Sequence, residues 1–315
     1  MLSSTADHLY WMARSMERAE NTARMLDVTY RMSLLKQVLI EPHHEWRAML
    51  SISGLYEGFA ARYDVSNAEN VLHFMALDKE NPGSIYNSLF IARENARAVR
   101  GSITSEMWEA LNSTWLEIRR IHAEGIDLDD VARFFEWVKE RSHLSRGIAH
   151  GTMLRDNTFR FIRLGSFLER ADNTARILDV KYHILLPSLK DIGGAADYYQ
   201  WSAVLRSVSA FESYRKVYRD QITPTRVGEL LILRPDMARS LITCVNEVQR
   251  LLIEINGPRS TELIDRCTQF HARLHTETID GIFEYGLHEY LSEFLEQIYD
   301  LGNLINTTYF WSTDE

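Results

Sequence analysis

The sequence ERAENTARMLDVTY at residues 17–30 returns at residues 169–182 as ERADNTARILDVKY. Eleven of the 14 positions are identical, at a constant offset of 152 residues. Self-similarity of this length within one chain indicates an internal duplication. Apolar residues recur at helical spacing through both copies, so each copy predicts one long helix.

Both copies carry more charge than the core face of a helix usually does. The polar residues in question are Glu17, Arg18, Asn21 and Arg24 in the first copy, and Glu169, Arg170, Asn173 and Arg176 in the second. Adjacent residues on a helix point about 100° apart, so a glutamate cannot pair with the arginine that follows it. If the copies meet about a twofold axis, the sequence predicts reciprocal pairs of Glu17 with Arg170 and of Glu169 with Arg18.

The rest of the chain repeats in the same order. Matching residues recur at offsets of 155 or 156 residues, namely Trp46 with Trp201, Ser84 with Ser240, and Gly147 with Gly302. These matches predict two units, 1–152 and 153–315, that pack as one globular body about a pseudo-twofold axis. No segment alternates with period two for long enough to be a strand, so we expect an all-α helical bundle with about six helices in each half.

The composition argues against several classes of function. The chain has 315 residues, 45% of them hydrophobic and 25% charged, as globular proteins do. A formal charge of −9 argues against a nucleic-acid partner. No apolar run approaches the length that crosses a bilayer, and charged residues such as Asp7 and Arg14 interrupt any signal peptide. We therefore expect a cytoplasmic protein that contacts no membrane.

The doubled Glu-Arg motif has two interpretations. It could form a polar pocket for a carboxylate, an amine or a phosphate, with a glutamate as acid or base. It could instead form a buried ion-pair network that fixes how the two halves dock. Retention of the motif in both halves favours the network, because a symmetric interface needs both copies.

A second arginine-rich stretch, ARENARAVR at residues 92–100, is kept in one half only. The dipeptide Asn81-Pro82 upstream of it predicts the start of its helix. The candidate anion-binding residues in it are Arg93, Glu94, Asn95, Arg97 and Arg100. Arg93, Arg97 and Arg100 are spaced to share one helix face and could hold an anionic group. A solvated arginine face explains the pattern equally well.

The sequence lacks the signatures of metal and nucleotide sites. A di-iron bundle needs Glu-x-x-His on two helices and two further glutamates, and Glu140 with His143 is the one match without a proline inside it. There is no P-loop, no dinucleotide fingerprint and no Gly-x-Ser-x-Gly motif. We expect neither a metal nor a cofactor.

Several motifs along the whole chain are shared with one known family. The stretches MLSSTADHLYWMARSMERAENTARMLDVTY (1–30), NPGSIYNSLFIARENARAVR (81–100), TMLRD (152–156) and YRKVY (214–218) resemble the bacterial alpha-E family, all-helical proteins named for a Glu-Arg motif. One departure is Ala238-Arg239-Ser240-Leu241, where the family pattern implies Pro-Arg-Ser-Leu. We expect this change to weaken a helix start and to alter little else.

The resemblance implies partners rather than an activity. Members of the family are encoded beside, or fused to, ATP-grasp-like ligases, with transglutaminase-like or proteasome-like peptidases nearby. ATP-grasp enzymes join a carboxylate to an amine through an acyl phosphate. The resemblance therefore implies a non-catalytic helical partner or substrate-binding subunit of such a ligase, in peptide or amide formation or modification. The alternatives are a transferase in its own right, with Glu17 or Glu169 as acid or base, and a homo-oligomeric scaffold.

Overall fold

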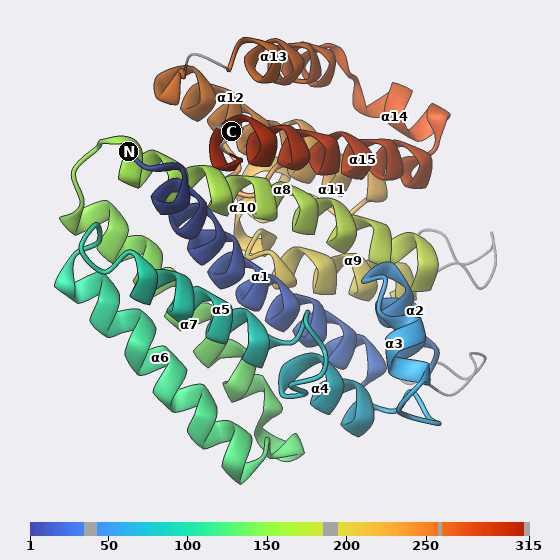
Figure 1. The fold of residues 1–315 in the computed structure, drawn as a ribbon. Coiled ribbons are helices and arrows are strands. Elements are labelled where there is room, and N and C mark those ends of the chain that lie inside the picture. Colours follow the sequence, from blue (N-terminus) through green and yellow to red (C-terminus); the bar gives the residue numbers. More distant parts are fainter. Residues whose placement is uncertain (35–42, 185–194, 258–259, 312–315) are drawn as a thin grey trace.

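The computed structural model describes residues 1–34, 43–184, 195–257 and 260–311, and every regular element in these residues is helical (Figure 1). The expected all-α class is confirmed. The α-helices are α1 (Ser3–Ser33), α2 (His44–Ile52), α3 (Tyr56–Ala60), α4 (Ala68–Ala76), α5 (Ile85–Ala98), α6 (Ser105–Glu124), α7 (Val131–Thr152), α8 (Asn157–Ile184), α9 (Ala195–Ser207), α10 (Phe211–Tyr218), α11 (Pro224–Gly228), α12 (Leu241–Ile255), α13 (Thr261–Thr276), α14 (Ile279–Tyr285) and α15 (Leu287–Ile305). Single turns of 3₁₀- or π-helix add η1 (Leu128–Asp130), η3 (Glu229–Leu233) and η4 (Asn306–Phe310).

The described residues form more helices than the sequence predicts. Seven α-helices lie within residues 1–152 and eight within residues 153–311, against about six expected in each. Left-handed glycines account for two of the extra breaks. Gly54 (φ 68°) lies between α2 and α3, and Gly286 (φ 114°) lies between α14 and α15. Glycine adopts such angles without the steric cost that other residues carry, so the chain can turn sharply there.

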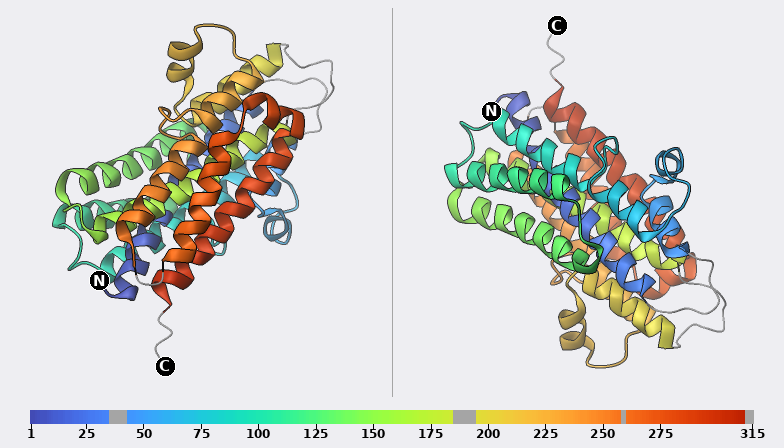
Figure 2. Two further views of the ribbon diagram at one scale, coloured as in Figure 1. Left: turned by 90° about the horizontal axis from the view of Figure 1, so that it is seen from above. Right: turned by 90° about the horizontal axis from the view of Figure 1, so that it is seen from below.

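The two helices that carry the repeated motif lie at the centre of the fold. α1 and α8 pack against each other, with α5 and α7 on α1 and with α12 and α15 on α8 (Figures 1 and 2). α6 covers the outside of α5 and α7, and α13 covers the outside of α12 and α15. The next helices cross over: α2 packs on α8, and α9 packs on α1.

This central position explains why α1 contains polar residues that need partners. Twenty of its 31 residues are buried, and the run Ala19–Thr29 is buried without a break. A helix enclosed on every side has no solvated face for its charged residues. Burying a charge is costly unless it is paired and hydrogen-bonded, so the buried acids of α1 must find cations on neighbouring helices.

The start of α5 differs from the sequence prediction. The helix begins at Ile85, and its N-cap is Ser84, whose Oγ accepts the N–H of Asn87 at 3.1 Å. Asn81 instead holds the turn before the helix, because its Oδ1 accepts the N–H of Gly83 at 3.0 Å. An asparagine that bonds to the backbone two residues on forms a turn of its own, which competes with capping.

The start of α12 repeats this arrangement. Ser240 is its N-cap and accepts the N–H of Thr243 at 3.2 Å. Each capping serine also donates its own N–H to the carbonyl three residues earlier, Ser84 to Asn81 and Ser240 to Met237, both at 3.0 Å. The serine cap of α12 is therefore intact beside Ala238, and the expected weakening of this helix start stays a prediction.

No helix in the described ranges combines the length and the apolar character that crossing a bilayer requires.

Gly165 allows α1 and α8 to approach closely. A Cβ at this position would overlap the carbonyl oxygen of Tyr10 and lie 3.3 Å from Cγ of Arg14. We expect Gly165→Ala to lower the free energy of unfolding by about 1–3 kcal/mol, because the backbones would have to separate. Urea denaturation of the purified protein measures the change.

Gly147 in α7 provides the matched control. It is exposed, and no neighbouring atom lies within 4 Å of a Cβ built there. Gly147→Ala should therefore stabilise the protein by about 0.5–1 kcal/mol, through the better helix propensity of alanine. Equal effects of the two substitutions would contradict the close approach.

Candidate functional site

Two reciprocal ion pairs join α1 to α8, as the sequence predicts. Arg170 donates through Nε and Nη2 to the two oxygens of Glu17, at 2.9 and 3.0 Å. Arg18 donates in the same way to Glu169, at 2.6 and 3.1 Å. The two glutamates are 1% and 5% exposed. Both pairs are bidentate, the geometry in which guanidinium and carboxylate bind most strongly.

The remaining two arginines of the motif pair along their own helices. Arg24 Nε donates to Glu20 one turn earlier, at 2.8 Å, and Arg176 Nε donates to Asp172 one turn earlier, also at 2.8 Å. Arg24 additionally donates to the backbone carbonyl of Ser207 at 2.6 Å, which ties α1 to the end of α9. These arginines bring a second acid on each helix into the network.

The two asparagines of the motif lie at the same contact. Asn21 donates through Nδ2 to the backbone carbonyl of Glu169 at 3.3 Å. The amide oxygens of Asn21 and Asn173 are buried, and neither has a hydrogen-bond donor among the described residues. Each oxygen is therefore an unused acceptor inside the network.

Two arginines that the sequence analysis did not select bridge the acids of α1. Arg146 of α7 donates through Nη1 to Glu17 at 2.6 Å and to Glu20 at 2.5 Å. Arg239, just before α12, donates to the same two acids, at 3.3 Å to Glu17 and by a short contact to Glu20. These partners lie 129 and 222 residues from Glu17 along the chain, so no local pattern could indicate them.

A third arginine outside the predicted set binds the acid of α8. Arg14 Nε donates to Glu169 at 2.7 Å. A sequence signal for this contact did exist, because Arg14 lies one helical turn before Arg18 and both face the same partner helix.

The arginines keep the acids ionised. Burial by itself would raise the pKa of Glu169, but Arg14 and Arg18 lower it to about 2. Burial likewise opposes ionisation of Glu17 and Glu20, and the arginines around them still hold both pKa values below the usual range. Burial lowers the pKa of Arg239 to about 10, against the opposing effect of the two acids it bridges.

The two sides of the network differ in exposure. On the Glu17 side, the side chains of Glu20 and Arg24 are 0% and 1% exposed. On the Glu169 side, the corresponding pair of Asp172 and Arg176 is 26% and 35% exposed. The first side is closed, whereas the second is open to solvent.

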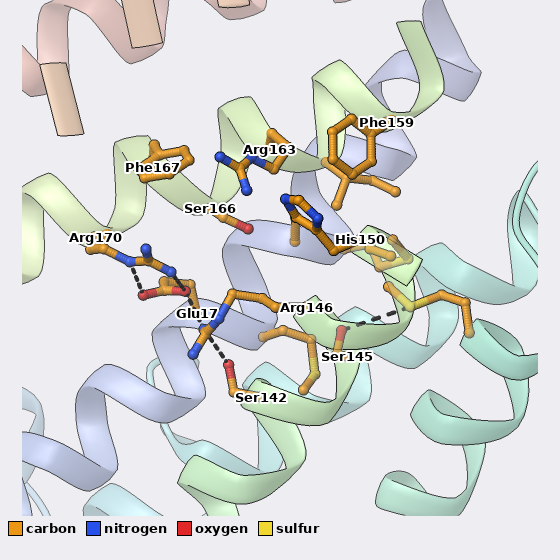
Figure 3. A pocket seen from close by; sticks show the side chains of 16 residues that line it. Glu17, Ser142, Ser145, Arg146, His150, Phe159, Arg163, Ser166, Phe167 and Arg170 are labelled. Atoms are coloured by element: carbon orange, nitrogen blue, oxygen red, sulfur yellow. Dashed lines mark hydrogen bonds and ion pairs between the residues drawn. The ribbon is translucent and has the colours of Figure 1, made fainter. Parts of the chain in front are cut away.

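A small cavity lies beside the closed side (Figure 3). Its volume is about 50 Å³, enough to hold ordered water. The polar residues that line it are Glu17, Ser142, Ser145, Arg146, His150, Arg163, Ser166 and Arg170. Arg163 crosses from α8 to α12, where it donates to Glu247 at 2.9 Å.

A larger cleft lies on the open side. Its volume is about 390 Å³, and it is lined by both copies of the motif together with residues of α15 and of the turns before α3 and α5. The lining residues are Trp11, Arg14, Arg18, Asn21, Thr22, Met25, Ser53, Leu55, Met75, Gly83, Glu169, Asp172, Asn173, Arg176 and Tyr299. Five of the eight motif residues singled out in the sequence therefore line one cleft.

The second arginine stretch does not form the single face that the sequence predicts. α5 ends at Ala98, so Arg100 lies beyond the helix. Arg93 and Arg97 both pair with Glu94, and the guanidinium of Arg97 lies 2.7 Å from it. The guanidinium groups of Arg93 and Arg100 lie over the ring of Trp108, which favours a stacked surface cluster. Asn95 contacts Nδ1 of His8 at 2.8 Å instead of joining this cluster.

Within the described ranges, no three His, Cys, Asp or Glu side chains gather as metal ligands would. His143, weighed in the sequence as a metal ligand, has another contact, and so has His275. His143 lies 3.5 Å from Glu20, and His275 lies 3.0 Å from Asn246.

Removing one buried acid should destabilise the fold. Glu17→Gln leaves Arg170 without its carboxylate and removes one of the two acids that Arg146 and Arg239 bridge. Breaking a buried pair on one side costs about 3–5 kcal/mol. We expect a loss of this size in the free energy of unfolding from urea denaturation.

Glu124→Gln is the control for this measurement. Glu124 pairs with Arg120 on the surface, where both side chains are more than half exposed. An exposed pair contributes less than about 1 kcal/mol. If Glu17→Gln cost no more than Glu124→Gln, the network would not be structural.

The ionised acids also predict how stability depends on pH. The pKa of Glu169 is about 2 in the folded chain and 4.5 for an unperturbed glutamate, so the unfolded state binds more protons between these values. The stabilisation is present above about pH 4.5 and is lost as the pH falls towards 2. Unfolding free energies measured across this range should show a shallower dependence in Glu169→Gln. An unchanged profile would contradict the lowered pKa.

Comparisons with known proteins agree with this architecture. Uncharacterised proteins of Mycobacterium bovis and Mycobacterium tuberculosis are each 22% identical over 324 residues, which covers 95% of this chain. The chain spans about a third (36%) of the length of these relatives. No solved structure gives a significant match. The family model Alpha-E, described as a predicted alpha-helical domain with a conserved ER motif, matches residues 1–310. The chain therefore belongs to the Alpha-E family.

Proposed function

We propose that this chain is a non-catalytic helical subunit that binds a peptide or amide substrate for an ATP-grasp-type ligase. The observation that carries the proposal is the difference between the two sides of the Glu-Arg network. On the Glu17 side both acids are buried and each is bound by three arginines, as in a structural contact. The Glu169 side lines a cleft of about 390 Å³ in which charged groups of both signs reach solvent.

The charge of the cleft suits a substrate with polar ends. Arg18 and Arg176 are 37% and 35% exposed in their side chains, and Asp172 is 26% exposed. Met25 and Met75 add apolar surface to the lining, as does Tyr299, which is 70% exposed. Concave sites with a few polar groups over an apolar floor are typical of small-molecule and peptide binding.

The paired glutamates favour binding over acid–base catalysis. A general base works best when its pKa lies near the operating pH. The pKa of Glu169 is about 2, and that of Glu17 is also below its usual range, because arginines surround both carboxylates. The alternative of a transferase with either glutamate as base therefore has less support than a binding role, and the scaffold alternative leaves the cleft unexplained.

We also propose that residues 1–152 and 153–315 are duplicated halves related by a pseudo-twofold axis. Four arrangements support this. The motif helices pair reciprocally, α2 and α9 each pack on the other motif helix, α5 and α12 begin with the same serine cap, and Arg24 and Arg176 make the same contact one turn back. Divergence after duplication would explain why one side is closed and the other open.

The greater length of the relatives supports a function that involves partner proteins. In the mycobacterial proteins the matching segment is a minor part of a longer polypeptide. We place the subunit in the cytoplasm, where the ligase would find ATP. Transglutaminase-like or proteasome-like peptidases are proposed as further partners.

A coupled assay tests the ligase partnership. Phosphate release from ATP is measured with candidate amino acids and peptides, for this chain, for an ATP-grasp-type ligase from the same organism, and for both. We expect release and a ligated product when both proteins are present. Turnover by this chain alone, or full turnover by the ligase alone, would overturn the proposal.

Two glycine substitutions test whether stimulation of the ligase depends on the cleft. Gly83 lines the cleft, and a Cβ there would make only ordinary contacts, at 3.4 Å from Asn81 and Leu55. Gly83→Arg should fill the cleft and abolish the stimulation of the ligase. Gly101→Arg, where no atom lies within 4 Å of the new Cβ, should leave it unchanged.

A further inference from the structure

The carboxylates on the two sides of the network are unequally satisfied. A carboxylate has about four acceptor positions. Glu17 accepts four hydrogen bonds from arginines, two at each oxygen. Among the described residues Glu169 accepts three, with two at Oε2 and one at Oε1. One acceptor position on the buried carboxylate of the cleft is unused.

The fourth donor to Glu17 identifies what the cleft lacks. It comes from Arg239, the residue directly before the capping serine of α12. The residue directly before the capping serine of α5 is Gly83, which lines the cleft together with Glu169 and Asp172. Where one side of the network has the side chain of Arg239, the other side has a glycine.

Two of the other arginine contacts correspond between the two sides. Glu17 and Glu20 are bound by four arginines, and among the described residues Glu169 and Asp172 are bound by three. The corresponding contacts are Arg170 with Arg18 across the two helices and Arg24 with Arg176 along each helix. Arg146 reaches its acids from α7, whereas Arg14 reaches Glu169 from α1 itself, so these two contacts differ.

Other unused groups in the cleft are also acceptors. Asp172 accepts its two hydrogen bonds from Arg176, whereas Glu20 is bonded by three arginines. The buried amide oxygens of Asn21 and Asn173, which line the cleft, have no donor among the described residues. Arg18 and Arg176 each use Nε and Nη2 on an acid.

We propose that the cleft binds a guanidinium group between Glu169 and Asp172, in the place that corresponds to Arg239. The ligand is an arginine side chain of the peptide substrate. Trp11 and Tyr299, which also line the cleft, offer aromatic faces of the kind on which a guanidinium stacks. This inference deepens the proposed function and rests on it for the peptide, but the binding step requires no ligase.

Titration calorimetry with blocked amino acids tests the inference directly. N-acetyl-arginine amide carries the guanidinium as its one charge, and N-acetyl-citrulline amide is its neutral isostere. We expect the arginine compound to bind at millimolar concentration or below, and at least ten times more tightly than the citrulline compound. N-acetyl-glutamate amide serves as the anionic probe. Preferential binding of the glutamate compound, or equal binding of arginine and citrulline, would overturn the inference.

Variants place the binding in the cleft. Gly83→Arg supplies a guanidinium from the chain itself and should weaken binding of the arginine compound at least tenfold, whereas Gly101→Arg should not. Asp172→Asn, at a half-exposed position that the fold tolerates more readily, should also weaken it about tenfold while binding of citrulline stays the same. Circular dichroism checks that each variant is folded. Unchanged binding in a folded Asp172→Asn variant contradicts the site.

The two proposals fail in different ways. If the arginine compound does not bind but Gly83→Arg still abolishes stimulation of the ligase, the cleft serves a substrate of other chemistry. If the arginine compound binds but no ligase is stimulated, the site stands and the partnership is wrong.

Discussion

The pairing of one helix with another through two bidentate guanidinium–carboxylate contacts is the constraint on which this fold depends. Glu17 and Glu169 are buried between α1 and α8, and neither could stay there without the arginine that the other helix supplies. A buried ion pair adds little net stability over an apolar contact, but an unpaired one is strongly unfavourable, so its value lies in specifying one arrangement. Any sliding or rotation of α1 on α8 would break both bidentate contacts. The surrounding helices pack around the contact between α1 and α8, and the ion pairs fix the register of that contact.

The sequence predicts the contact between α1 and α8 well because the residues that form it lie within two short motifs. The repeated motif identifies both helices, and the angle between neighbouring residues on a helix excludes pairing within a copy, which leaves the reciprocal pairs. Helix class follows from periodicity for the same reason. The helix boundaries are harder to predict from the sequence, because Asn81 suits both a helix cap and a turn. The hydrogen bonds of the neighbouring backbone decide between these two roles.

The rest of the network could not be predicted in this way. Arg146 and Arg239 reach Glu17 from helices whose placement depends on the packing of the whole chain. The same limit applies to the arginine stretch in α5, where spacing suggested a shared face. The helix ends at Ala98 and the side chains of Arg93 and Arg97 turn to Glu94. Nor does the sequence distinguish a closed side from an open one, since the two copies of the motif are nearly identical.

The distance along the chain between Glu17 and its partners has a consequence for biosynthesis. Arg170 follows Glu17 by 153 residues and Arg239 follows it by 222. At roughly 5–20 residues per second, the ribosome completes the second of these roughly 10–40 s after the glutamate. During that interval Glu17 and Glu20 have only Arg24 and Arg146 of their four arginines. The network around Glu17 is therefore completed only after most of the chain has been synthesised.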